Sequence, residues 1–270
     1  KLPAAQTKLP SLRLGGPTFE KFDSPDAWVG VVRRLGYNAA YCPVGAGEKD
    51  DVVNAYASAA KKADIVIAEV GAWSNPISPD EKTRQEALAK CRRQLALADR
   101  IGARCCVNIS GSRGTLWDGH SPENMTEETF DMIVETTRAI IDDVKPTRTY
   151  FTLETMPWAY PDSPDSYLRL LKAIDRERFA AHLDPVNLIC SPQRYYTNAE
   201  LIRECFKKLG PYIRSCHAKD ILLQQKHTTH LDEVRPGLGA LDYAVFLGEL
   251  SKLPDTPLML EHLPNAEEYR

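Results

Sequence analysis

The chain contains 270 residues, of which 43% are hydrophobic and 26% charged, and its formal net charge is −3. This much apolar material supports a large packed core, so the composition excludes a disordered chain. A weak net charge with both signs interspersed provides no surface for gripping a phosphate backbone or an anionic membrane, so we expect neither nucleic acid nor membrane as a partner.

The sequence also indicates a compartment. It contains no run of about 18 apolar residues and no charged-then-apolar leader, a pattern typical of a soluble cytoplasmic protein. Its seven cysteines have no CxxC spacing and lie mostly among apolar residues. We therefore expect reduced thiols in the core.

Eight short runs rich in β-branched, aromatic and other apolar residues predict strands. In chain order they are Ser11–Gly15, Ala39–Val44, Ile65–Val70, Ala103–Ile109, Thr149–Glu154, Phe179–Asp184, Ile213–His217 and Pro257–Glu261. Longer stretches with apolar positions three or four apart come after these runs, which predicts parallel strands joined by crossover helices. Eight is the strand number of a (β/α)₈ TIM barrel, and we expect one such domain over residues 1–270.

The intervening helices are indicated by apolar stripes and by their end signals. One stripe contains Leu88, Cys91, Leu95, Ala98 and Ile101, and another contains Phe130, Ile133, Val134, Thr137, Ile141 and Val144. Ser-Pro-Asp triplets at Ser24–Asp26, Ser78–Asp80 and Ser163–Asp165 predict helix starts, with Glu81 completing a capping box with Ser78. Gly36, Gly102 and Gly210 mark helix ends.

The end of the sequence predicts an incomplete last βα unit. After the eighth predicted strand only Pro264–Arg270 remain, too few for a full closing helix. We therefore expect this barrel to lack a complete last helix. An apolar groove exposed there would result from truncation of the sequence, or it would be filled by another subunit, in a homo-oligomer or with a different partner.

Four consecutive predicted strands end in metal-binding side chains, namely Glu154, Asp184, His217 and Glu261. In such barrels the active site lies at the carboxyl ends of the strands. One such residue alone is more often an ordinary solvated strand end, but three carboxylates and an imidazole together would repel one another unless a cation compensates them. Oxygen ligands with one nitrogen favour Mn²⁺, with Mg²⁺ or Co²⁺ also suitable, so we expect one divalent cation.

The chain resembles the sugar phosphate isomerase/epimerase superfamily, the xylose-isomerase-like barrels. The shared motifs are Leu153-Glu154, His182-x-Asp184-Pro185-x-Asn187, His217-x-Lys219-Asp220, Gly237-x-Gly239-x-x-Asp242 and Leu260-Glu261-His262. This resemblance implies that the four strand-end residues occupy the family's metal-ligand positions. In its ketose 3-epimerases the two glutamates also move protons on opposite faces of the sugar, which implies catalytic roles for Glu154 and Glu261.

We therefore expect a metal-dependent isomerase or epimerase acting on a sugar, keto-sugar or polyol. Proton abstraction next to a metal-bound carbonyl would produce an enediolate intermediate. The resemblance has one departure, because epimerases of this kind usually carry His where this chain has Asn187, and Asn does not shuttle protons.

The alternative is a dehydratase or lyase that uses the same proton abstraction. Such enzymes resemble inosose or dehydroshikimate dehydratases, or cleave 3-keto-glycosides, including C-glycosides. A non-catalytic barrel subunit is less favoured because all four ligands are retained. An abasic-site endonuclease is also less favoured, because its trinuclear zinc site needs histidines where strands two and three end in Cys42 and Glu69.

Seven further residues at or beyond strand ends are candidates for contact with a carbohydrate substrate: Asn108, Trp117, Trp158, His182, Asn187, Lys219 and Arg235. Trp73, Trp117 and Trp158 come after three successive strands, and their rings suit the apolar face of a sugar. Lys219 would neutralise a phosphate or carboxylate on the substrate. Each has an ordinary alternative as core packing, a loop hydrogen bond or a solvated charge. Strand alternation turns His262 away from Glu261 and predicts a structural role for it.

Overall fold

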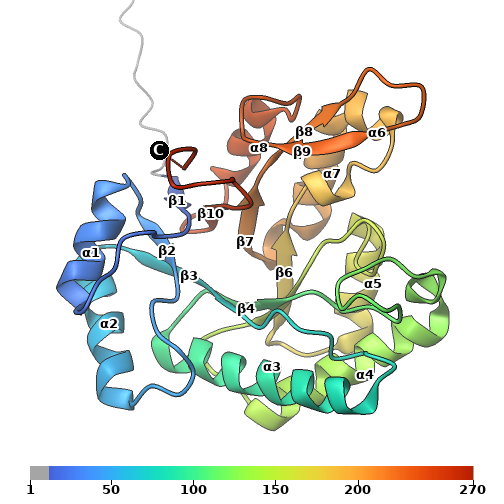
Figure 1. Ribbon diagram of the computed structural model, residues 1–270. Helices are drawn as coiled ribbons and strands as arrows, with labels where there is room; N and C mark the ends of the chain where they lie inside the picture. Colours follow the sequence, from blue (N-terminus) through green and yellow to red (C-terminus); the bar gives the residue numbers. More distant parts are fainter. Residues whose placement is uncertain (1–11, 270) are drawn as a thin grey trace, which may run out of the picture.

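The molecule is a nearly closed barrel of parallel strands, seen in Figure 1. The structure is a computed structural model that describes residues 12–269. The barrel strands are β1 (Arg13–Gly15), β2 (Ala39–Tyr41), β3 (Val66–Gly71), β4 (Cys105–Asn108), β5 (Phe151–Glu154), β6 (Phe179–Leu183), β7 (Ile213–Ala218) and β10 (Pro257–Leu260). Their order in space is β1-β10-β7-β6-β5-β4-β3-β2. All eight predicted strands and the (β/α)₈ class are confirmed, although Ser11 lies outside the described residues.

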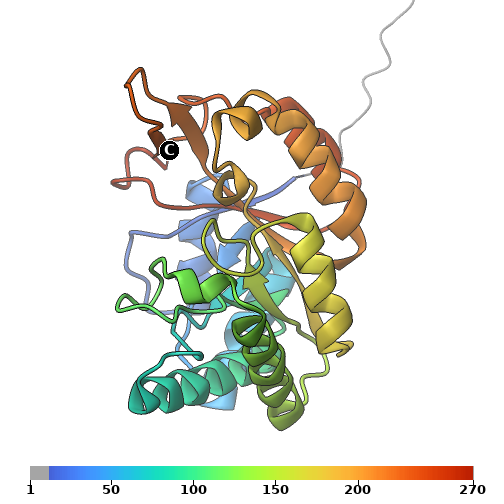
Figure 2. The same cartoon turned by 90° about the vertical axis from the view of Figure 1, so that its right-hand side faces the viewer.

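Helices form the outer layer. They are α1 (Pro25–Arg34), α2 (Asp50–Lys62), α3 (Glu81–Ile101), α4 (Glu127–Val144), α5 (Pro164–Ile174), α6 (Pro192–Tyr196), α7 (Asn198–Leu209) and α8 (Tyr243–Leu250), with short 3₁₀ turns at Pro122–Met125, Val186–Leu188 and Gly210–Tyr212. Figure 2 shows α3 to α5 and α7, coloured teal to orange, along the outside of the strands. Between residues 12 and 269, no helix combines the length and apolar character that a membrane span needs.

The predicted apolar stripes face the core. All five stripe residues of α3 are buried, and those of α4 are buried except Val144, which is partly buried. The seven cysteines are free thiols, and five of them are buried. Gly36 and Gly102 lie just past helix ends in the left-handed conformation, with φ of 75° and 76°, whereas Gly210 is right-handed and begins the third 3₁₀ turn.

Two of the three predicted helix starts are confirmed. Ser24 and Ser163 each accept a hydrogen bond from the amide three residues later, at 3.3 and 3.1 Å. The third prediction is wrong by two residues, because Asp80 caps α3 and accepts a hydrogen bond from Thr83 N at 2.8 Å. A carboxylate there interacts favourably with the positive end of the helix dipole, while Ser78 instead accepts from Asp80 N.

An unpredicted antiparallel hairpin, β8 (Asp220–Leu223) and β9 (Leu231–Val234), lies in the long connection between β7 and β10. Asp220 anchors the loop after this hairpin, since its carboxylate accepts from Gly237 N at 2.9 Å and Leu241 N at 2.8 Å. A Cβ on Gly239 would lie 2.3 Å from this carboxylate, so only glycine fits there. The hairpin is thereby held beside the carboxyl end of β7.

The segment after β10 forms turns in place of a helix, as far as residue 269. Tyr37 Oη donates to Tyr269 O at 3.2 Å, and the Tyr269 ring lies 5.3 Å from that of Phe19. Figure 1 shows this end of the chain beside β1. The expected absence of a helix after the eighth strand therefore holds for the described residues, and the expected partner subunit stays a prediction.

Candidate metal centre and substrate pocket

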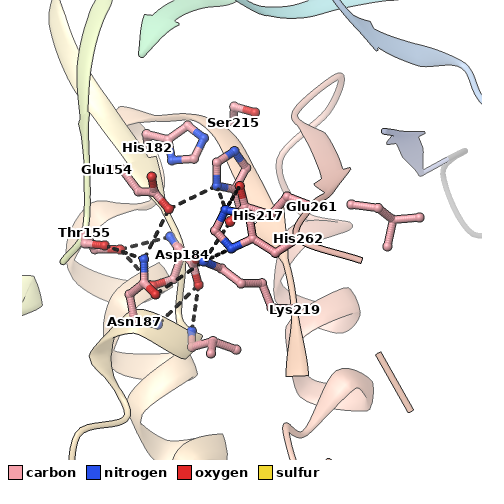
Figure 3. Close-up of polar contacts among 12 residues, drawn as sticks. Glu154, Thr155, His182, Asp184, Asn187, Ser215, His217, Lys219, Glu261 and His262 are labelled. Carbon is pink, nitrogen blue, oxygen red and sulfur yellow. Dashed lines mark hydrogen bonds and ion pairs between the residues drawn. The ribbon is translucent and has the colours of Figure 1, made fainter. Parts of the chain in front are cut away.

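The four predicted ligand residues converge at the carboxyl ends of the barrel strands (Figure 3). They are Glu154, which ends β5, Asp184, directly after β6, His217 in β7, and Glu261, directly after β10. The strand register aligns them, because Glu154 pairs with His182 and Met259 pairs with His217. One ligand atom from each of the four lies within 4.8 Å of the others.

The ligand atoms fit a hard divalent cation. His217 Nδ1 lies 3.1 Å from Glu154 Oε1 and 2.9 Å from Glu261 Oε1. Asp184 Oδ2 and Glu261 Oε1 are buried, and the groups that approach them most closely are charged: Lys219 lies 2.8 and 2.7 Å from the two oxygens, and His217 Nδ1 lies 2.9 Å from Glu261 Oε1. Three carboxylates gathered in a buried site repel one another unless positive charge compensates them, and three carboxylates with one imidazole are suitable ligands for Mn²⁺ or Mg²⁺.

Lys219 provides positive charge within this cluster. Its buried Nζ lies 2.8 Å from Asp184 Oδ2, 2.7 Å from Glu261 Oε1 and 3.5 Å from Glu233 Oε2. Although burial opposes the shift, Asp184, Glu261 and Glu154 raise the pKa of Lys219. Burial raises the pKa of Asp184 to about 7, and repulsion by the neighbouring carboxylates of Glu154 and Glu261 contributes to this shift. The positive charge of Lys219 opposes it. Even with Lys219 beside it, Asp184 is thus incompletely compensated, and a divalent cation would complete the compensation.

His217 is held between two groups of carboxylates. On the side away from Glu154, its Nε2 lies 3.2 Å from Oε2 of Glu69 in β3. Glu69 Oε1 contacts His182 Nε2 at 2.9 Å and accepts a hydrogen bond from Ser215 Oγ. Despite burial, His182 and His217 hold the pKa of Glu69 well below its ordinary value. For His217, Glu261, Glu69 and Glu154 overcome the effect of burial and raise the pKa well above its ordinary value.

A second combination of residues, Glu69, His182 and His217, is also compact enough to hold a metal. Its geometry favours a hydrogen-bond network instead, because both Glu69 oxygens already contact donors. The set of four ligands that includes Glu154 gathers three carboxylates around His217 and Lys219 and borders a pocket. It is therefore the better candidate for the cation.

A pocket of about 450 Å³ lies against this cluster. Of the predicted substrate residues, Trp117, Trp158, Asn187 and Lys219 line it. Asn187 Nδ2 donates to Glu154 Oε1 at 3.2 Å, which ties this amide to a candidate ligand. Trp73 also lines the pocket, as its position after the third strand predicts.

Three further predicted substrate residues do not line this pocket, and their contact with a substrate stays a prediction. Asn108 is buried and holds the loop after β3, accepting from Ser74 N at 3.0 Å and donating to Ser74 O at 3.2 Å. His182 is buried with Glu69. Arg235 pairs with Glu268 at 3.2 Å and does not line the pocket. Each of these three side chains instead forms hydrogen bonds or an ion pair with neighbouring protein groups.

Sequence reasoning missed several contributors to the site, among them His262, Glu233 and Glu69. His262 lines the pocket because its φ of 57° breaks the strand alternation that predicted an outward ring, and its Nδ1 lies 3.1 Å from Glu233 Oε1. Glu233 belongs to the unpredicted hairpin. Glu69 had a visible signal, since it is a carboxylate inside an otherwise apolar predicted strand.

Comparisons with known proteins identify similar folds. A family model described as a xylose isomerase-like TIM barrel matches residues 29–270. No curated protein sequence matches the chain.

Several solved structures are similar over nearly their whole length. A xylose isomerase-like TIM barrel protein from Mycobacterium smegmatis, in complex with magnesium, is 17% identical with a TM-score of 0.63, covering 96% of this chain and 92% of that one. A probable 3-DHS dehydratase from Bacillus anthracis is 17% identical with a TM-score of 0.67, covering 92% and 91%. A D-psicose 3-epimerase with D-tagatose from Clostridium cellulolyticum H10 is 15% identical with a TM-score of 0.65, covering 94% and 86%. At these identities the similarity establishes the fold.

Proposed function

This chain belongs to the xylose isomerase-like TIM barrel family, and we propose that it acts as a divalent-metal-dependent isomerase or epimerase on a sugar, keto-sugar or polyol. The observation that carries this proposal is the convergence of Glu154, Asp184, His217 and Glu261 beside a pocket. The epimerase and the dehydratase among the similar structures support a carbohydrate-related enzyme of this kind.

In the proposed mechanism these four side chains hold one cation, with Mn²⁺ as the first candidate and Mg²⁺ or Co²⁺ as others. When bound, the cation would polarise a carbonyl and a neighbouring hydroxyl of the sugar and so acidify the adjacent C–H bond. Asp184 is buried and does not line the pocket, so its role is restricted to holding the cation.

Glu154 and Glu261 both line the pocket and are the proposed proton-transfer groups. Despite burial, the nearby His217 lowers the pKa of each, so both are ionised and able to accept a proton. They come from β5 and β10, which β6 and β7 separate in the sheet, so they approach a bound sugar from different directions. One would remove the proton beside the carbonyl to form an enediolate. The other would take up a proton from solvent and deliver it to the carbon.

Asn187 supports a second candidate, a dehydratase or lyase. Its amide contacts Glu154 and orients that carboxylate, but an amide is too weak an acid to deliver a proton to the enediolate. Proton abstraction and then loss of a leaving group needs no proton returned to the carbon. The two candidates therefore share proton abstraction and differ in the fate of the enediolate.

Solvent deuterium exchange tests both candidates. We would incubate the Mn²⁺-supplemented protein in D₂O with a panel of neutral ketoses and keto-glycosides and monitor the products by NMR and mass spectrometry. Deuterium incorporation without loss of water or aglycone supports an isomerase or epimerase, whereas release of either supports a lyase. Glu154→Gln and Glu261→Gln should abolish exchange, and Glu135→Gln on the exposed face of α4 should not. No exchange with any compound, together with no bound metal, contradicts the proposal.

A further inference from the structure

The pocket combines a charged floor with an aromatic mouth. The floor contains the candidate ligands and Lys219. The mouth contains Trp117, in the loop after β4, and Trp158, in the loop after β5, and each residue is 41% exposed. Met156 and Pro157 add apolar surface to the same pocket. The site therefore offers two chemically different surfaces to one ligand.

The loops that carry the two mouth tryptophans are fastened to each other. Trp158 Nε1 donates to the carbonyl of Asp118, the residue after Trp117, at 2.8 Å. The buried Asn124 side chain joins the same two loops, because it donates to Trp158 O at 3.2 Å and to Gly119 O at 3.1 Å. The tryptophans are thus held partly exposed by a buried amide. Exposed aromatic surface that is fixed in this way is typical of a ligand-binding surface.

The charges of the lining disfavour an anionic substrate. Asp118, Glu154, Glu233 and Glu261 line the pocket, while Lys219 is the one Lys or Arg among the described lining residues. Lys219 is already paired with carboxylates, so it is not free to bind a phosphate as its position in the sequence suggested. His262, the other cationic group of the lining, is likewise paired with Glu233 at 3.1 Å. The lining therefore offers a substrate phosphate or carboxylate no Lys, Arg or His side chain that is free of a carboxylate partner.

We infer that the substrate is an uncharged glycoside whose sugar carries a keto group, as the proposed proton abstraction requires, and whose aglycone bears an apolar ring. The sugar lies over the ligand cluster and the aglycone stacks on Trp117 and Trp158. This inference rests on the proposed function, because the cluster orients the sugar end. The pocket volume of about 450 Å³ is within the range of pockets that bury drug-sized ligands, about 300–1,000 Å³, so a sugar with an attached ring can be accommodated.

Binding calorimetry on the Mn²⁺-supplemented protein tests this inference without turnover. The probes are phenyl β-D-glucoside, methyl β-D-glucoside, glucose and glucose 6-phosphate. We expect the phenyl glucoside to bind about tenfold more tightly than the methyl glucoside, because its ring stacks on the tryptophans. Glucose 6-phosphate should bind no more tightly than glucose.

Variants assign the preference to the mouth. Trp117→Ala and Trp158→Ala should each remove most of the phenyl preference and retain methyl glucoside binding, which also reports that the variants fold. Trp158→Phe should restore part of the preference. Tyr196→Ala, which removes an exposed aromatic ring on α6 outside the pocket, should leave it intact.

Three results would overturn the inference: equal or unmeasurable binding of the two glucosides, a phenyl preference that survives both alanine variants, or tighter binding of the phosphate. The deuterium-exchange experiment reports the proposed function separately. Exchange without an aromatic preference rejects the inference alone. An aromatic preference with neither exchange nor bound metal rejects the proposed chemistry and retains the glycoside site.

Discussion

Glu69 Oε2 lies 3.2 Å from Nε2 of His217, while Nδ1 of the same ring faces Glu154 and Glu261. Both Glu69 and His217 are buried. A carboxylate that accepts a hydrogen bond from the rear nitrogen of a metal-binding histidine fixes the ring orientation and leaves the front nitrogen free to bind. Glu69 therefore orients His217 toward the candidate cation.

We expect Glu69→Gln to weaken Mn²⁺ binding by about 10- to 100-fold, because the neutral amide supports the His217 ring less strongly than a carboxylate does. Titration calorimetry measures the affinity, and thermal unfolding in EDTA confirms that the variant is folded. Glu135→Gln, on exposed α4, is the matched control and should bind Mn²⁺ as the parent does. If Glu69→Gln bound Mn²⁺ with the affinity of the parent protein, Glu69 would not contribute to metal binding through His217.

Lys219→Met should destabilise the metal-free protein by roughly 3 kcal/mol, because it leaves the buried carboxylate of Asp184 without its ammonium partner. Mn²⁺ should recover most of this loss, since the cation compensates the same oxygens. Urea unfolding in EDTA and in MnCl₂ measures the difference. The control Lys208→Met removes two ion pairs on the surface and should have little effect on stability in either buffer, because solvent screens exposed pairs. An equal loss of stability in EDTA and in MnCl₂ would show that Lys219 does not compensate the same carboxylates as the cation.

Asp99 should make folding sensitive to acid. Its carboxylate accepts from the amides of Thr147 at 2.8 Å and Arg148 at 2.6 Å in the turn before β5. Although burial opposes the shift, these amide hydrogen bonds lower the pKa of Asp99 below its ordinary value. As the pH falls, Asp99 is therefore protonated first in the unfolded chain, where its pKa has the ordinary value of about 4. The stabilisation by Asp99 is complete above that pH and is lost as the pH falls toward the lower pKa of the folded state.

Asp99→Asn should accordingly cost about 1 kcal/mol at pH 7 and progressively less below about pH 4. Urea unfolding at pH 7 and pH 3 measures both values. Asp131→Asn, on the exposed face of α4, is the control and should show no such change. A penalty for Asp99→Asn that is equal at the two pH values would contradict the assignment.

Gly111→Ala should destabilise the loop that leads from β4 to the pocket. The φ of Gly111 is 104°, and an added Cβ would lie 2.2 Å from Asn75 Oδ1. That oxygen accepts from Ser112 N at 3.0 Å, so the substitution breaks a buried hydrogen bond in addition to straining the backbone. We expect a loss of about 3 kcal/mol by thermal unfolding. Gly36→Ala has φ of 75° and open space around the Cβ, so it should cost only about 1 kcal/mol. Equal losses of stability in the two variants would show that the Asn75 side chain moves away from the added Cβ without an energetic cost.

Local pattern in the sequence determined the eight strands and the four candidate ligands. Alternation of short apolar runs with helical stripes reflects contacts within each βα unit, so it is legible without long-range information. Parallel strands in a barrel all have their carboxyl ends at the same end of the barrel. Once eight strands were identified, the four strand-end residues could therefore be predicted to lie close together: Glu154, Asp184, His217 and Glu261. The same rule placed Trp73, Trp117 and Trp158 at the pocket.

Only the tertiary structure decided how these residues are supported. Glu69 contacts His217 across 148 sequence positions, and Glu233 reaches His262 from a hairpin that has no place in the βα repeat. The inward turn of His262 depends on one positive φ, and the withdrawal of Asn108 and Arg235 from the pocket depends on partners in other loops. Strand periodicity encodes which face a side chain takes within a regular element, but the choice among competing polar partners is made only when distant loops pack together.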